Sequence, residues 1–343
     1  PKEADAYTVR AYAYDWQKRF QDAIADATRA ISLNSHSVEK HEARAWAYLA
    51  TGQDKRCIED CNKVLKLDPE SAFALGTRAN AHLAMKQFEA SLQDSDDAVE
   101  LEPQNPEWLI CRAWSWFGMR QWQEAIEDAT QAISLSPQLT DAYVIRCYSM
   151  GQDGRLNDAL ADADRAVESN PQSARSYEAR AWVHDQERQW NDVVTDASKA
   201  IALDPSLDSA YTLRAWAFIE QKEADRARAD AQTAIVTLHS KEPGPHAAMA
   251  FVHCLKGEWH EAIQEANIAL TLDAELSEAY EARAWAEHSL GQWDGLVKDA
   301  TIAISFKPLN ARLYNWRADG NENLGNRQKA ADDRQRAQKL NED

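Results

Sequence analysis

The sequence predicts an all-α fold made of ten tandem helix pairs, and three observations support this. An Arg-Ala-Trp triplet recurs at intervals of 68, 68, 34 and 69 residues, so the underlying period is 34 residues with one insertion. Gly and Pro supply only 11 and 10 of 343 residues, which is a helical composition. Apolar residues recur at helical spacing within each period. Because stacked repeats need no single core, the length does not imply several globular domains.

Aligned on the repeated Arg, the chain forms one repeat domain over residues 4–343. Every repeat has 34 residues except the seventh, which has 35. The repeats begin at Ala4, Val38, Ala72, Pro106, Thr140, Ala174, Asp208, Pro243, Ser277 and Ala311. Positions within a repeat are counted from these residues throughout.

Each repeat predicts two antiparallel helices. Apolar residues at positions 4, 8 and 11 share one face of a first helix, and those at positions 20, 24, 27 and 28 share one face of a second. Ala predominates at positions 8, 20 and 27, where it lets the helices approach closely, and Pro at position 32 ends the second helix in six repeats. One such pair cannot bury its own apolar face, so neighbouring pairs must stack.

Two charged positions predict a ladder of ion pairs. Position 7 is Arg in nine of ten repeats, and position 23 on the second helix is acidic in all ten. The exception, Met249, occurs in the repeat whose Asp is replaced by Glu265. We therefore expect positions 7 and 23 to pair across the two helices as a structural element that sets their register.

The pattern resembles the tetratricopeptide repeat (TPR) family, which has a 34-residue helix pair with aromatic, small and Pro residues at the corresponding positions. The resemblance covers the whole of residues 4–343. Arg-Ala replaces the family's Leu-Gly at positions 7 and 8, and Ala usually replaces its aromatic at position 24, a variant similar to bacterial members. The resemblance implies a right-handed superhelical solenoid whose concave groove, lined by positions 2, 5, 9, 12 and 13, binds peptides.

By this resemblance, the groove residues are mainly aromatic and acidic. Eight repeats carry an aromatic at position 9: Tyr12, Trp46, Trp114, Tyr148, Trp182, Trp216, Phe251 and Trp285. Positions 2 and 5 contribute Asp5, Glu39, Glu42, Glu107, Asp141, Glu178, Glu278 and Glu281, against Arg175 and Arg312. The aromatic residues have two interpretations. They fill the space beside Ala at position 24, or they form an exposed ladder for a ligand.

These residues predict a non-catalytic scaffold that binds a protein, through an extended basic or apolar segment held by cation–π and charge-assisted contacts. The net charge of −18 argues against nucleic acid as the ligand. The alternative is a structural protein that self-associates through its solenoid ends into a fibre or tube. The basic residues with which some TPR proteins hold a C-terminal carboxylate are missing.

No motif points to catalysis, a metal or a cofactor. P-loop, dinucleotide-binding and nucleophile-elbow sequences are absent, and His260-Glu261 lacks the second His of a zinc-protease helix. Cys57 and Cys61 lie one helical turn apart, where they are expected to be small core residues. The odd count of five Cys favours a reducing, cytoplasmic compartment, and no apolar run reaches the length of a membrane span. The start at Pro1 rather than Met suggests a piece of a longer protein.

One segment interrupts the regular pattern. Residues 238–246 (LHSKEPGPH) contain the inserted residue, two Pro and a Gly, and directly precede the repeat without Arg. The change is either a tolerated loop variation or a kink that alters the superhelical pitch. We expect this junction to be locally weaker than the others.

Overall fold

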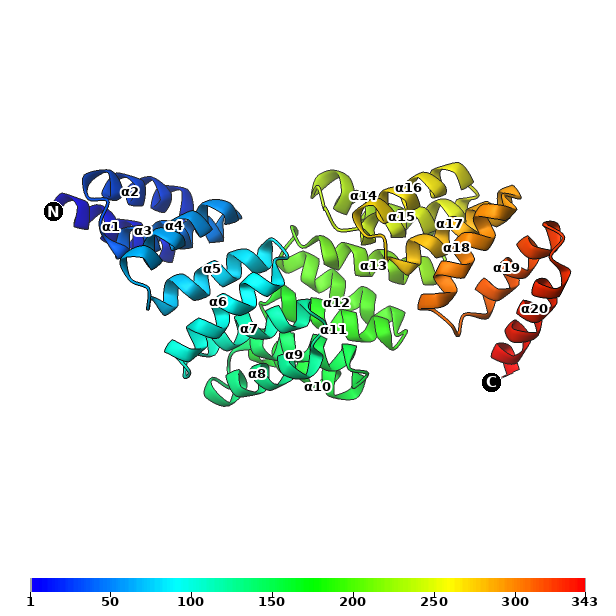
Figure 1. Ribbon diagram of the computed structural model, residues 1–343, viewed down its shortest axis with the longest axis horizontal. Coiled ribbons are helices and arrows are strands. Elements are labelled where there is room, and N and C mark those ends of the chain that lie inside the picture. The colour runs from blue at the N-terminus through cyan, green and yellow to red at the C-terminus, as the bar shows by residue number, and fades with distance from the viewer. Residues whose placement is uncertain (1, 343) are drawn as a thin grey trace. The chain divides into compact units, whose positions relative to one another are not determined.

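The computed structural model describes residues 2–342, in which every regular element is a helix (Figure 1). The helices belong to two compact units, Pro1–Pro171 and Gln172–Asp343. The first contains α1 (Lys2–Trp16), α2 (Phe20–Leu33), α3 (Val38–Ala50), α4 (Asp54–Leu67), α5 (Ala72–Ala84), α6 (Phe88–Leu101), α7 (Pro106–Gly118), α8 (Trp122–Leu135), α9 (Thr140–Gln152) and α10 (Leu156–Ser169).

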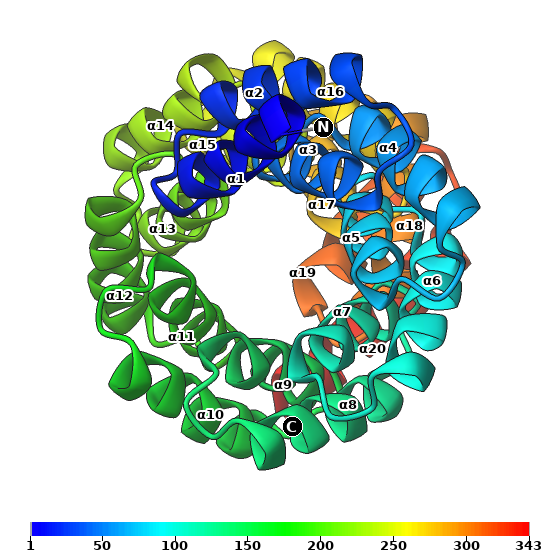
Figure 2. The same ribbon diagram turned by 90° about the vertical axis from the view of Figure 1, so that its left-hand side faces the viewer.

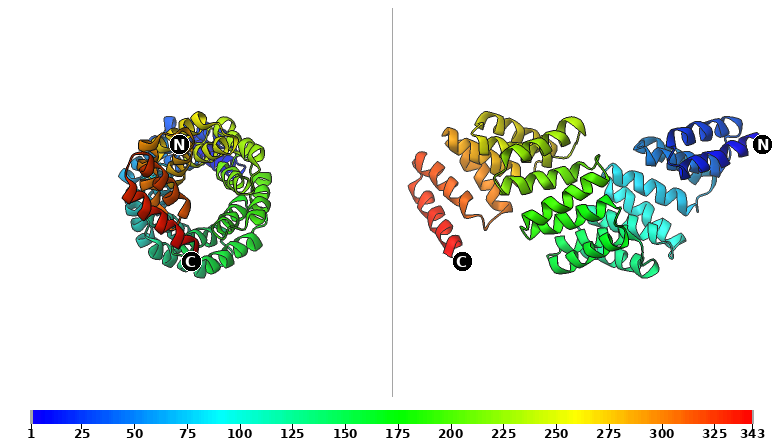
Figure 3. Two further views of the ribbon diagram at one scale, coloured as in Figure 1. Left: turned by 90° about the vertical axis from the view of Figure 1, so that its right-hand side faces the viewer. Right: turned by 180° about the vertical axis from the view of Figure 1, so that it is seen from behind.

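The second unit repeats the same arrangement with one irregular helix. It contains α11 (Ala174–Gln186), α12 (Trp190–Leu203), α13 (Asp208–Glu220), α14 (Ala224–Gln232), the π-helix η1 (Thr233–Thr237), α15 (Gly244–Lys256), α16 (Trp259–Leu272), α17 (Ser277–Leu290), α18 (Trp293–Phe306), α19 (Ala311–Asn323) and α20 (Arg327–Glu342). Figure 3 shows its last pair, α19 and α20, as antiparallel helices.

Each predicted repeat is one helix pair, which confirms the all-α solenoid class. Ala113 and Ala125, at positions 8 and 20 of the fourth repeat, are fully buried, as the close approach of α7 and α8 requires. Leu109 and Ile145 fill the larger spaces of the same core. Within each unit, every first helix after the initial one also packs on the second helix of the preceding repeat. A single continuous solenoid over residues 4–343 stays a prediction.

The turn between the two helices has a backbone requirement that the sequence interpretation missed. Position 15 lies in the left-handed region in all ten repeats, and its residue is either Gly or a cation. The glycines are Gly52, Gly154, Gly257, Gly291 and Gly325, and the cations are Lys18, Lys86, Arg120, Arg188 and Lys222. Gly adopts this conformation without strain, whereas a residue with a Cβ pays about 1 kcal/mol. The signal was in the sequence, as the restriction of position 15 to Gly, Lys and Arg.

The predicted ladder of ion pairs is present in all nine repeats that have Arg at position 7. In the fifth repeat, Arg146 Nε lies 2.7 Å from Asp162 Oδ2, and Nη2 lies 2.8 Å from Oδ1. The Asp side chain is largely buried, whereas the Arg keeps part of its surface exposed. This two-point geometry fixes the angle between the helices as well as their distance.

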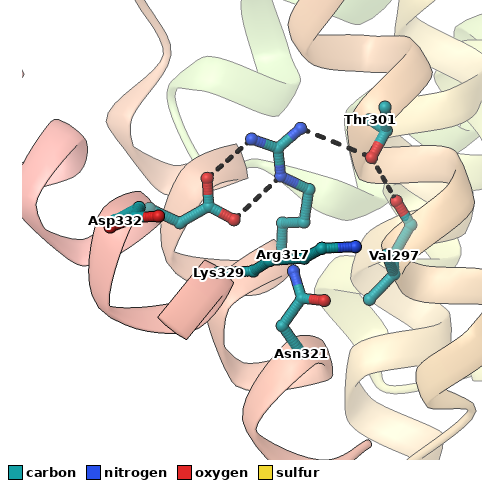
Figure 4. A pocket seen from close by; sticks show the side chains of 7 residues that line it. Val297, Thr301, Arg317, Asn321, Lys329 and Asp332 are labelled. Carbon is teal, nitrogen blue, oxygen red and sulfur yellow. Dashed lines mark hydrogen bonds and ion pairs between the residues drawn. The ribbon is translucent and has the colours of Figure 1, made fainter. Parts of the chain in front are cut away.

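The third guanidinium arm links neighbouring repeats. Arg146 Nη1 donates to Thr130 Oγ1 on α8 at 3.1 Å, and Arg112 Nη1 contacts Asp96 on α6 at 2.9 Å. Figure 4 shows the same arrangement in the second unit, where Arg317 reaches Thr301 on the preceding second helix. The acceptor is always at position 25 of the preceding repeat. One Arg therefore ties three helices together.

The eighth repeat replaces this pair with another. Met249 cannot form it, and Glu265 instead lies 2.7 Å from His246 Nδ1 at position 4. The second repeat shows the same position-4 contact in addition to its Arg, because His41 Nδ1 lies 3.1 Å from Asp60 Oδ1. The acid at position 23 thus keeps a partner on the first helix even where the Arg is lost.

The irregular junction begins one turn earlier than residue 238. The last turn of the second helix widens into the π-helix Thr233–Thr237, in which Leu238 N donates to Thr233 O at 3.0 Å. The connection that follows covers 238–243, against 204–207 at the preceding junction, so the inserted residue lies in the loop. A π-turn was not expected from the sequence, because π-helices are rare and occur mostly as single turns within α-helices.

Candidate ligand groove

The first helices lie on the inner side of each unit. Among the described residues, successive first helices contact one another (α5 with α7, α7 with α9), whereas successive second helices do not. Helices that are closer together on one side make the stack curve toward that side. Figure 2 shows α7 and α9 on the inner side of their arc, and α8 and α10 outside. The concave face of each unit is therefore built from first helices.

None of the five position-9 indoles is fully buried. The exposed fraction is 42% for Trp46, and Trp114, Trp182, Trp216 and Trp285 are partly exposed, as are Tyr12 and Tyr148. Only Phe251 of the predicted aromatic residues is buried, at 7%. Each of Trp114 and Trp216 also packs one side against a core cluster that contains a position-24 Ala, Ala129 or Ala231. The two interpretations are thus compatible, because one ring edge fills space and the other reaches solvent.

Neighbouring position-9 rings contact one another and form a stripe in each unit. In the second unit, the ring centroids of Trp216 and Phe251 are 5.1 Å apart, and those of Phe251 and Trp285 are 6.3 Å apart. In the first unit, Trp114 and Tyr148 are 6.0 Å apart. We call these the aromatic stripes. The repeat between Trp46 and Trp114 has Asn80 at position 9, whose amide is held by its own helix at Gly76 O.

Several acids on the first helices lie in a desolvated environment. Glu42 is half-buried and accepts a hydrogen bond from Ser71 Oγ at 2.9 Å, and burial raises its pKa. Burial also raises the pKa of Glu107, with a further contribution from the nearby charge of Asp141. In the second unit, burial raises the pKa of Glu178. A cation placed beside such a carboxylate relieves part of this cost.

The remaining predicted acids differ in their availability. Glu39 is exposed and accepts from Ser37 Oγ at 2.5 Å, which lowers its pKa. Glu278 lies 2.8 Å from Lys307 Nζ. Glu281 is buried and is held by Lys307 and Arg312, so the assignment of Glu281 as an acid exposed to a ligand was wrong. Two basic residues near in space neutralise this end of the groove.

The same cluster shows how a cation is held by these residue types. Arg312 Nη2 lies 2.6 Å from Glu281, and the guanidinium carbon lies 5.9 Å from the Trp285 ring centroid and 5.1 Å from that of Trp316. The two indoles are themselves stacked, with centroids 6.1 Å apart. A guanidinium between a carboxylate and an aromatic face combines charge-assisted and cation–π contacts.

Comparison with known proteins agrees with the repeat pattern. The family model described as "Tetratricopeptide repeat" matches residues 41–71, within the second repeat, and the other nine repeats follow in phase with it. The chain has the TPR fold. No curated protein matches the sequence.

Solved TPR structures are similar in fold. Human IFIT1, solved as a dimer with m7Gppp-AAAA, has a TM-score of 0.63 at 17% identity, covering 97% of this chain and 81% of that chain. A tetratricopeptide repeat protein from Parabacteroides merdae has a TM-score of 0.55 at 15% identity, covering 73% of this chain and 98% of that chain. At these identities the comparison establishes the fold alone.

Two clefts lie away from the aromatic stripes. One, of about 370 Å³, is lined by Val297, Thr301, Arg317, Asn321, Lys329, Asp332 and Asp333 (Figure 4). The other, of about 320 Å³, is lined by Ile58, Asn62, Arg78, His82, Ala90, Gln93 and Asp94. Their lining residues occupy the same repeat positions: 21 and 25 of one repeat, and 7, 11, 19, 22 and 23 of the next. They are the spaces between successive second helices of the TPR stack.

The cysteines and other polar groups give no sign of a metal site. Cys57 and Cys61 are buried with their sulfurs 4.0 Å apart, and this contact together with burial raises the pKa of Cys61. Within residues 2–342, no group of three His, Cys, Asp or Glu side chains is arranged to hold a metal ion. No helix in that range is long and apolar enough to cross a membrane.

Proposed function

We propose that this TPR protein is a non-catalytic scaffold that binds an extended protein segment on its concave side. The observation that carries the proposal is the pair of aromatic stripes, whose rings contact one another along consecutive first helices and are partly exposed except for the buried Phe251. Aromatic side chains supply much binding energy for little conformational entropy, and they are enriched among the residues that dominate interfaces.

The acids beside the stripes favour a segment with basic side chains. Glu107 and Glu42 are partly desolvated carboxylates with raised pKa values, so a Lys or Arg of the ligand would stabilise their charged forms. Arg312 shows this arrangement within the chain, between Glu281 and two indoles. A peptide in which basic residues alternate with aromatic or apolar residues would fit the spacing of the acids and the aromatic rings.

The same charges disfavour nucleic acid. Human IFIT1 was solved with m7Gppp-AAAA, a phosphate-rich ligand. Phosphate groups are bound by basic side chains. In this chain positions 2 and 5 carry eight acids against two Arg, and the net charge is −18. We therefore propose a basic protein segment rather than a phosphate-bearing ligand.

The alternative of end-to-end assembly is less well supported. In such an assembly, the last helix of one copy, α20, would have to pack against the apolar face of α1 in the next copy. Positions 24 and 28 of α20 are Arg334 and Gln338, both exposed, where earlier repeats have small and apolar residues. Arg334 is already engaged by Asp319 and Glu322. Light scattering over a range of protein concentrations tests this alternative, which requires the molar mass to increase with concentration.

The experiment that tests the scaffold proposal is selection of binding peptides from a random library. The selected peptides are then labelled and titrated with the protein. We expect enrichment of Lys or Arg beside aromatic residues. Trp114→Ala is expected to weaken binding by about 1–2 kcal/mol, in the range of an aromatic interface contact. Glu107→Gln should weaken it less and make it less dependent on salt.

The matched control is Phe306→Ala, because Phe306 is 46% exposed but lies on a second helix. Thermal unfolding of each variant is needed too, since the buried edge of Trp114 also contributes to stability. Equal binding by the wild type and Trp114→Ala, or tighter binding of oligoadenylate than of any peptide, would contradict the proposal.

A further inference from the structure

The second aromatic stripe ends at a site that is filled by an arginine of the same unit. The Arg312 guanidinium carbon lies 5.9 Å from the ring centroid of Trp285 and 5.1 Å from that of Trp316. Its Nη2 lies 2.6 Å from Glu281 Oε1. Both indoles are partly exposed. Two aromatic rings and a carboxylate on α17 and α19 thus bind a cation, which the chain itself supplies.

Glu281 keeps other partners if Arg312 moves away. Lys307 Nζ and Asn310 Nδ2 each lie 3.3 Å from one of its carboxylate oxygens. Lys307 is itself held by Glu278 at 2.8 Å, so it stays beside Glu281. The buried carboxylate, whose side chain is 5% exposed, therefore keeps one cation and one amide donor. Loss of the Arg312 contact leaves no unpaired buried charge.

Arg312 can move because its side chain lies largely in water. The side chain is 52% exposed, and among the described residues Glu281 is its one ion-pair partner. Position 2 of the repeat does not require Arg, since it is acidic in five of ten repeats. Arg175, the other Arg at this position, is exposed and forms no ion pair within residues 2–342. The place of the Arg312 guanidinium is therefore set by Glu281 and the two indoles.

We propose that Glu281, Trp285 and Trp316 form a subsite for an arginine side chain of the ligand, and that Arg312 closes this subsite in the free protein. The arginine subsite rests on the proposed function, since its ligand is the basic segment bound along the second aromatic stripe. The arginine of the ligand takes the place of Arg312, which moves into solvent. Arginine fits better than lysine, because a planar guanidinium lies against an indole face while it donates to a carboxylate.

Arg312 competes with such a ligand. It is tethered beside the arginine subsite, which gives it a high effective concentration there. The measured affinity for a ligand arginine is reduced in proportion to the fraction of molecules in which the subsite is open. Removal of Arg312 is therefore expected to strengthen binding, whereas removal of a residue that holds the ligand weakens it.

The test uses the full chain labelled with 5-fluorotryptophan and titrated with acetyl-arginine amide, a probe that does not depend on a selected peptide. Trp285→Phe and Trp316→Phe assign the two ¹⁹F resonances. In Arg312→Ala we expect a saturable shift of both, with a dissociation constant on the order of 1–10 mM. In the wild type the dissociation constant should be about fivefold higher or more. Acetyl-citrulline amide, which has the same shape without the charge, should shift neither resonance.

Arg175→Ala is the matched control. It removes the same charge from the same repeat position, but among the described residues Arg175 lies over no aromatic ring. The affinity of this variant for acetyl-arginine amide should equal that of the wild type. Arg312→Gln is a second test of the subsite, because its amide keeps a donor for Glu281 if the alanine variant proves unstable. It should also bind the probe more tightly than the wild type does. Thermal unfolding shows that each variant is folded.

Equal affinity of the wild type and both Arg312 variants for acetyl-arginine amide, or equal shifts with acetyl-citrulline amide, would overturn the arginine subsite. The outcomes for the groove are separate. If the variants behave as expected but no selected peptide shifts the Trp216 resonance, the subsite stands and the proposed groove fails. If selected peptides shift Trp216 while acetyl-arginine amide leaves Trp285 and Trp316 unchanged in every folded variant, the groove stands and the subsite is refuted.

Discussion

Arg146 on α9 donates two parallel hydrogen bonds to Asp162 on α10, from Nε and Nη2. Its remaining guanidinium nitrogen, Nη1, donates a third to Thr130 on α8. The pair was predicted from positions 7 and 23, but the third contact was not. It makes the Arg a link between repeats as well as within one. Because the Asp is largely buried, loss of the Arg would leave an unpaired buried charge.

We expect Arg146→Met to destabilise the first unit by about 3–5 kcal/mol, the usual effect of breaking a buried pair. Adding Asp162→Asn should recover part of the loss, because it removes the unpaired charge. A double-mutant cycle by denaturant unfolding measures the coupling. Arg155→Met is the control, since the pair of Arg155 with Asp158 is exposed and should contribute no more than about 1 kcal/mol. Additive effects of the two changes would refute the pairing.

The left-handed turn at position 15 predicts two changes of opposite sign. Lys222→Gly should raise the free energy of unfolding by up to about 1 kcal/mol, because Gly removes the strain of a positive φ. Gly154→Ala should lower it by a similar amount, and a Cβ there would meet no neighbour, so the effect would be conformational alone. Thermal unfolding measures both. A stabilising Gly154→Ala would contradict the assigned turn.

Glu287 predicts a specific dependence of stability on pH. It is buried beside Arg283 and Asp299 in space that Gly295 leaves free, and burial raises its pKa from 4.5 to about 7. The folded state therefore holds an extra proton between these values. The contribution of Glu287 to stability is fully present below pH 4.5 and is lost as the pH rises through 7.

Glu287→Gln should abolish this dependence and stabilise the protein at pH 8 by up to about 3 kcal/mol. Denaturant unfolding of both proteins between pH 4 and pH 8 is the measurement. Parallel stability curves for the two proteins would show that Glu287 titrates normally.

The junction after the seventh repeat is expected to be weak only locally. Hydrogen exchange should be faster in the π-turn and loop, 233–243, than in the regular turn at 203–213. The helices on either side should stay protected, because Phe218, Met249 and Phe251 share one core cluster, and Arg228 pairs with Glu258 across the junction. Because of this packing, we expect the helices on both sides of the junction to open together. Fast exchange throughout α15 would contradict this expectation.

The repeat boundaries, the helix pairs and the Arg–Asp pairs could be predicted from the sequence because each depends on contacts repeated nine or ten times at a fixed spacing. The third arm of Arg146 could not, since position 25 varies among Thr, Asn, Asp, Ser and Gln, which share only their ability to accept a hydrogen bond. The placement of Glu281 was wrong for a related reason. Its partners are Lys307 and Arg312, which lie at two different positions of the repeat and do not follow a periodic pattern along the chain.

The most direct test of the proposed groove is ¹⁹F NMR of the protein labelled with 5-fluorotryptophan, titrated with a basic, aromatic peptide from the selection. Single Trp→Phe changes assign the resonances. We predict that Trp114, Trp216 and Trp285, on the aromatic stripes, shift with the peptide, whereas Trp122, Trp190 and Trp293, at position 17 on the second helices, do not. Shifts confined to the position-17 residues or to Trp16, with the stripes unchanged, would contradict peptide binding on the concave face.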